Sequence, residues 1–75
     1  MPKNIRNKKT STGRIRTDVD SFIAAKSKST FNYRQVAQAI GQESNAAMRI
    51  IALYLAELAF DGHIIETAPG LYRST

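Results

Sequence analysis

Apolar residues recur with a helical period over the first two thirds of the chain and with a strand-like period over its last part. The first repeat, at spacing i, i+3, i+4, consists of Val19, Phe22 and Ile23. This spacing places the three side chains on one face of a helix. We expect a first helix over about residues 18–27, capped at its start by Thr17 or Asp18.

A second helix is predicted over residues 33–40, between two residues that favour helix ends. Asn32 is a good N-cap because its side chain can accept a hydrogen bond from a backbone N–H one turn further on. Gly41 stands where the left-handed residue that ends a helix belongs. The inner stripe would consist of Val36, Ala37 and Ile40. Just before this helix, Thr30 and Phe31 can form a very short strand.

The third and longest helix is predicted over residues 46–60, after a short polar break that supplies its cap, Ser44 or Asn45. At about 100° per residue, one side of this helix is apolar. That side carries Ala47, Ile51, Tyr54, Leu55 and Leu58, flanked by Met48 and Ile50. The opposite side carries Asn45, Ala46, Arg49, Ala52, Leu53, Ala56 and Phe60.

Beyond the third helix the apolar period changes to about 2, which is typical of strands. Residues 63–66 and 71–74 are predicted to form two short strands. The turn between them contains Pro69 and Gly70, which suit fixed and positive φ angles respectively. Alternation places Tyr72 and Arg73 on opposite faces of the last strand, and we expect Tyr72 to be the buried one.

The order helix, short strand, helix, tight turn, helix, hairpin is that of a winged helix-turn-helix. The expected fold over residues 17–75 is therefore mainly α, with three helices and a two- or three-stranded wing sheet. Residues 1–16 hold only Ile5 and Ile15 as large apolar groups, so we expect them to form a disordered basic arm.

Positive charge is concentrated in this arm. The chain carries a net charge of +5. Six cations and no acid precede Thr17: Lys3, Arg6, Lys8, Lys9, Arg14 and Arg16. Residues 17–75 carry the other five cations and all six acids, so the net charge of this part of the chain is −1. We expect the arm to neutralise phosphates, with a merely solubilising segment as the alternative.

The outward side of the third helix offers few groups that read bases. In helix-turn-helix proteins this helix enters the major groove, and strong readers carry several Arg, Asn, Gln or Lys residues there. Here Asn45 and Arg49 are followed by alanines, so contact with nucleic acid should depend on shape and charge. The other expected contacts outside the arm are Arg34 and Arg73. Leu53 and Phe60 should pack against the first helix or the hairpin, or else contact another protein.

Residues for catalysis or metal binding are scarce. There is no cysteine, and His63 is a lone histidine without a cluster of ligands. Asp18 and Asp20 are explained by the positive end of a helix dipole. We therefore expect no catalytic residue, metal or cofactor. No apolar run approaches the 18 or so residues of a membrane span, and we expect a cytoplasmic protein.

Two stretches carry a resemblance to a known family: "FNYRQVAQAIG" and "RIIALYLAELAFDGHIIETAPGLYR". Together they resemble the N-terminal winged-helix domain of bacterial ribonuclease R, over about residues 30–73. The matching positions are Phe31, Tyr33, Val36, Ile40, Leu55, Leu58, Gly62, Ile64, Ile65, Gly70 and Tyr72. The resemblance implies an accessory domain of a processive 3′→5′ exoribonuclease, which helps to bind and open structured RNA. The catalytic and other RNA-binding domains would follow in the parent protein.

Three hypotheses follow for the function. The first is a monomeric accessory domain that binds nucleic acid, RNA in preference to DNA, within a larger ribonuclease R-like chain. The second is a free-standing DNA-binding regulator, which would dimerise to read paired half-sites. The third is a module that docks a protein partner through Leu53, Phe60 and the nearby alanines.

Overall fold

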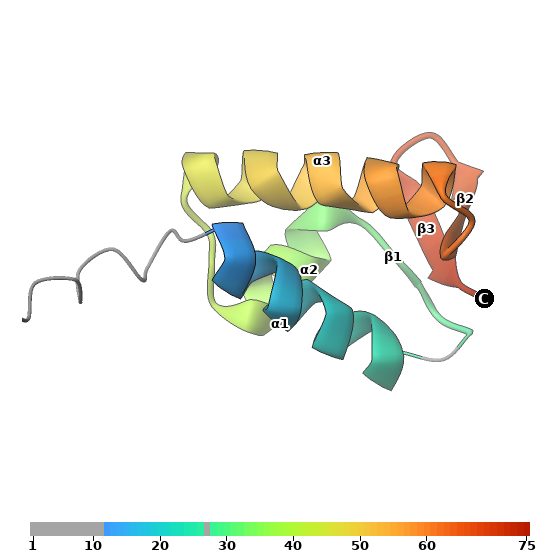
Figure 1. Ribbon diagram of the computed structural model, residues 1–75, viewed down its shortest axis with the longest axis horizontal. Coiled ribbons are helices and arrows are strands. Elements are labelled where there is room, and N and C mark those ends of the chain that lie inside the picture. The colour runs from blue at the N-terminus through green and yellow to red at the C-terminus, as the bar shows by residue number, and fades with distance from the viewer. Residues whose placement is uncertain (1–11, 27) are drawn as a thin grey trace, which may run out of the picture.

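The computed structural model describes residues 12–26 and 28–75, which form three helices and one three-stranded antiparallel sheet (Figure 1). In chain order the elements are α1 (Thr12–Ala25), β1 (Thr30–Phe31), α2 (Tyr33–Ile40), α3 (Asn45–Phe60), β2 (Ile64–Ala68) and β3 (Leu71–Ser74). Helix α3 runs along one side of the molecule, α1 and α2 pack against it, and the sheet lies where α3 ends. The expected mainly helical class is confirmed.

Helix α1 begins at Thr12, so the predicted start near Asp18 is wrong and the predicted arm is five residues too long. The reason is Ile15, which lies one turn before Val19. Both side chains are fully buried, so Ile15 belongs to the same apolar stripe as Val19. Residues 1–11 of the expected arm lie outside the described residues.

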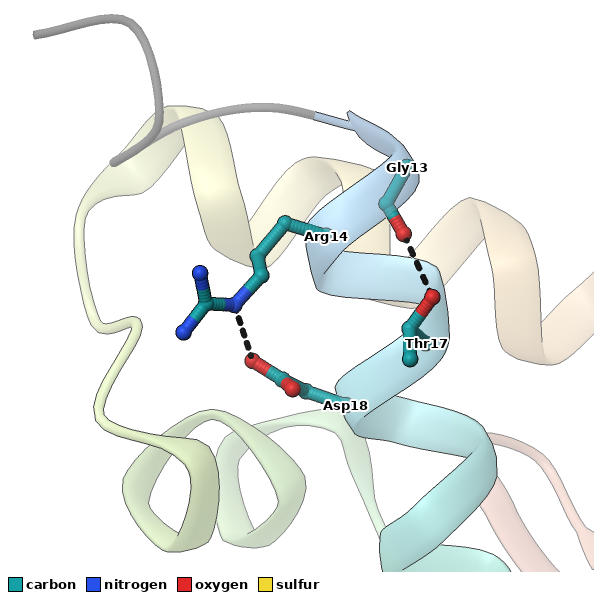
Figure 2. A network of polar contacts seen from close by, with 4 residues as sticks. All are labelled: Gly13, Arg14, Thr17 and Asp18. Atoms are coloured by element: carbon teal, nitrogen blue, oxygen red, sulfur yellow. Dashed lines mark hydrogen bonds and ion pairs between the residues drawn. The ribbon is translucent and has the colours of Figure 1, made fainter. Parts of the chain in front are cut away.

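The polar residues at the start of α1 bond within the helix instead of capping it (Figure 2). The hydroxyl of Thr17 donates to the carbonyl oxygen of Gly13 at 3.0 Å. Arg14 Nε lies 3.5 Å from Asp18 Oδ2, an i, i+4 ion pair. The expectation that Thr17 or Asp18 is the N-cap, and that Asp18 and Asp20 complement the helix dipole, is therefore wrong.

The predicted ends of α2 and the Ser44 cap of α3 are confirmed, and α3 begins at Asn45, one residue before its predicted start. Asn32 and Gln35 form a reciprocal capping box, in which each side chain accepts a 2.9 Å hydrogen bond from the other residue's backbone N–H. Gly41 ends α2 in the left-handed region, at φ 74°. Ser44 caps α3 by accepting from the backbone N–H of Ala47 at 3.1 Å. All three helix ends are therefore fixed by residues next to them in sequence.

The sheet has the strand order β1-β3-β2, so the two-residue strand β1 pairs with the last strand of the chain. Phe31 lies opposite Tyr72 in the β1–β3 pair. Tyr72 is 8% exposed, which confirms the prediction that it is the buried residue of its strand. Strand β2 extends to Ala68, two residues beyond its predicted end.

The core draws on every element that the structure describes. Its buried members are Ile15, Val19, Phe31, Val36, Ala37, Ala47, Ile51, Leu55, Ile64 and Tyr72. Phe22 of α1 meets Phe31 of β1 edge to face, with ring centroids 5.5 Å apart. None of the polar or charged residues within 12–26 and 28–75 is buried. The apolar face predicted for α3 is thus its core face, and its opposite side faces solvent.

Candidate functional site

The first half of the outward side of α3 carries the polar groups expected to meet nucleic acid. Asn45 is the first residue of the helix and Arg49 lies one turn further, and both are exposed. Arg49 forms no ion pair with any residue in the described part of the chain. Its guanidinium is therefore available to a partner.

The second half of the same side is apolar and uncovered. Leu53 is 61% exposed and Phe60 is 91% exposed. The expectation that they pack against α1 or the hairpin is therefore wrong. The sheet contacts α3 through β2, and the core face of α3 meets α1 and α2, so no described element is left to cover this side. The two side chains instead form a surface suited to contact with another macromolecule.

Two open hollows border this apolar surface. The first is lined by Leu53, Ala56, Glu57, Phe60 and Asp61. The second lies between α3 and β2; it shares Ala56 and Phe60 with the first and includes Ile65. Ile65 is 42% exposed, and the sequence pattern did not lead us to expect it at the surface. Its alternation with the buried Ile64 was the available signal.

The described cations among the predicted contacts are spread over four elements, α1, α2, α3 and β3, and do not gather along α3. Arg34 is the second residue of α2, with its guanidinium carbon 5.8 Å from the centre of the Tyr33 ring. Arg73 lies on β3 opposite Ile65, at an exposed position of the sheet. Lys3, Arg6, Lys8 and Lys9 lie outside the described residues. The structure therefore brings no basic groove together from the predicted residues that it describes.

Arg16 is held against α3 by two contacts. Its guanidinium carbon lies 4.9 Å from the centre of the Tyr54 ring, and its Nη2 lies 3.5 Å from Glu57 Oε1. Arg14 is similarly engaged with Asp18. Arg16 therefore links α1 to α3, and Arg14 links two turns of α1. Because both guanidinium groups already have partners within the protein, they are less available to phosphates.

Tyr54 and Asp20 form a second polar link between α1 and α3. The Tyr54 hydroxyl donates a 2.7 Å hydrogen bond to Asp20 Oδ1. This bond, together with burial and the negative charge of Asp20, raises the pKa of Tyr54 to about 12. The apolar period places Tyr54 in the core stripe but does not predict this hydrogen bond, because the partner is 34 residues away.

Metal clusters and membrane-spanning helices are not found in the described part of the chain. Within residues 12–26 and 28–75, no three His, Asp or Glu side chains gather closely enough to hold a metal ion. Over the same residues, no helix combines the length and the apolar character that crossing a bilayer requires.

Comparisons of the chain with known protein families, with curated proteins and with solved structures found no match in any of the three.

Proposed function

We propose that the protein is a winged helix-turn-helix module that binds nucleic acid through its basic N-terminal segment, by contacts with phosphates. The element order supports the winged-helix assignment. The pairing of the short strand β1 with β3 also supports it, as does the four-residue break between α2 and α3. In this assignment α2 and α3 are the helix-turn-helix and β2–β3 is the wing.

The observation that carries the proposal is the distribution of charge. Within the first eleven residues stand Lys3, Arg6, Lys8 and Lys9, without a single acid. Such a cluster releases counterions from a nucleic acid backbone, a driving force that does not depend on sequence. RNA is favoured over DNA by the resemblance to the N-terminal domain of ribonuclease R, in which case the catalytic residues would belong to a larger parent chain.

The surface of α3 argues against sequence-specific reading. After Asn45 and Arg49 the outward side continues as Leu53, Ala56 and Phe60, none of which donates a hydrogen bond from its side chain. Specific readers rely on several such donors to base edges. A DNA-binding regulator is therefore the weaker alternative, while protein docking is favoured by the exposure of Leu53 and Phe60.

Salt-dependent titrations test the proposal. In the full chain, Lys3, Arg6, Lys8 and Lys9 are replaced by Gln, and affinity for a structured RNA is measured against salt concentration. We expect weaker binding and a flatter slope of log K against log[salt], by up to about 0.9 for each duplex phosphate that the protein no longer neutralises. A panel of DNA duplexes should show no preferred sequence.

A matched control variant distinguishes the effect of where the cations lie in the chain from the effect of net charge alone. Replacing four cations elsewhere by Gln, namely Lys26, Lys28, Arg34 and Arg73, gives the same net charge. It should leave most of the salt slope in place. If both variants lost the same affinity and salt slope, only net charge would matter. An unchanged slope in the N-terminal variant would show that the N-terminal segment is not part of the interface. A preferred duplex sequence would favour the regulator.

A further inference from the structure

A single straight seam runs down the outward side of α3. Its residues follow at i, i+4, i+7 and i+11: Arg49, Leu53, Ala56 and Phe60. This is the spacing by which two helices pack side by side through knobs and holes. All four residues are exposed, so nothing in the described part of the chain occupies the seam.

From this seam we infer that α3 docks against α3 of a second copy of the chain, with the two helices antiparallel. A twofold interface brings the same patch of both copies together, so the patch must complement itself. The seam meets this requirement in its shape and in its charges.

The shape complements itself because large and small side chains alternate. Leu53 and Phe60 project from the helix, and Ala56 between them leaves a recess that belongs to both neighbouring hollows. In an antiparallel pair, Leu53 of one copy enters the recess at Ala56 of the other. Phe60 then packs between Leu53 and the aliphatic stem of Arg49 of the second copy, and Ile65 extends the contact onto β2.

The charges complement each other because they differ at the two ends of the seam. Arg49 begins the seam, and Asp61 lies beside its other end, directly after Phe60 on the rim of the first hollow. Neither forms an ion pair with any residue of 12–26 or 28–75. When the helices cross antiparallel at the level of residue 55, Arg49 of each copy faces Asp61 of the other, and two ion pairs close the ends of the apolar centre.

The same features make nucleic acid a poor occupant of this surface. The seam offers one cation, and Glu57 and Asp61 beside it would repel phosphates. A dimer through α3 goes beyond the proposed function and is independent of it, because it forms without nucleic acid. It differs from the monomer that the sequence led us to expect.

The first test is the mass of the full chain in solution, without nucleic acid. Sedimentation equilibrium from about 1 μM to about 1 mM spans the range of weak interfaces. We expect the mass to rise with concentration from 8.3 kDa toward twice that value. Leu53→Glu should raise the dissociation constant at least tenfold, whereas Gln38→Glu, which adds the same charge at an exposed position of α2, should not. Circular dichroism verifies that both variants fold.

A charge swap tests the antiparallel orientation. Arg49→Glu and Asp61→Arg should each weaken the dimer, because each places like charges opposite one another. Combining both in one chain should restore it, since the two end pairs are then reversed. A chain that stays at 8.3 kDa throughout, or a dimer indifferent to Leu53→Glu, would overturn the inference. Failure of the double variant to recover would overturn the antiparallel arrangement.

Discussion

Tyr54 shows how a single side chain ties two helices together. Its hydroxyl donates to Asp20, and its ring lies under the guanidinium of Arg16. The hydrogen bond requires the protonated phenol, so the folded state favours the proton and the pKa rises to about 12. The stabilisation is present below the ordinary pKa of 10 and is lost as the pH rises through about 12.

Asp20→Asn should lower the pKa of Tyr54 toward its ordinary value of 10. The substitution removes both the charged hydrogen-bond acceptor and the nearby negative charge. Titration of tyrosinate absorbance measures the shift, and Tyr54→Phe identifies the component that belongs to this residue. If Tyr54 of Asp20→Asn still titrated at the same high pH, burial and the charge of Glu57, and not Asp20, would be what raises its pKa.

Helix α1 is the element in which local pattern and tertiary packing disagree most. Its first turns are polar and basic, and in sequence they resemble a disordered segment. The buried side chain of Ile15 reverses that interpretation, because its burial offsets part of the entropy of ordering these turns. The contacts of Arg16 with Tyr54 and Glu57, and of Arg14 with Asp18, contribute as well.

Ile15→Ala should lower the free energy of unfolding by about 2–5 kcal/mol, the usual range for removing a fully buried aliphatic side chain. Urea denaturation measures the change. Thr17→Ala, at an exposed position of the same helix, should change it by about 0.5 kcal/mol or less. Truncation should follow the same boundary: removing residues 1–11 should preserve the fold, and removing 1–16 should cost as much as Ile15→Ala or more. Equal losses for Ile15→Ala and Thr17→Ala would contradict the role of Ile15.

Helix α2 is the opposite case, since both of its ends follow from the sequence. Asn32, Gln35 and Gly41 lie within or beside the helix and satisfy its end groups locally. No comparable local signal marks the candidate site. Whether Leu53 and Phe60 are covered depends on where α1 and the hairpin lie, and those positions result from contacts between residues far apart in the chain.

For the whole molecule, the two proposals together have a consequence that neither has alone. A dimer through α3 would carry two basic N-terminal segments. When one has bound a nucleic acid, the other is held near the same molecule at a high effective concentration.

We therefore expect the dimer to bind a long RNA at least tenfold more tightly than the Leu53→Glu variant, at concentrations where the wild-type chain is dimeric. On an RNA too short for both segments the two proteins should bind alike. Fluorescence anisotropy titrations with RNAs of graded length measure this difference. Equal affinity on long RNAs would show that the two segments act independently, and weaker binding of Leu53→Glu to short RNAs would place Leu53 in the RNA interface itself.

Local sequence was sufficient to predict the helices and strands and most of their ends. Caps, glycine stops and apolar periods act between residues a turn or so apart, so they can be recognised without knowing the fold. Apolar periodicity also predicted the burial of Tyr72 and of the core face of α3. Three features required the folded chain: Ile15 extends α1 into the core, Asp20 bonds Tyr54, and Leu53 and Phe60 stay in solvent. Whether a side chain is buried depends on its contacts with residues from distant parts of the chain. A local sequence pattern does not identify those residues.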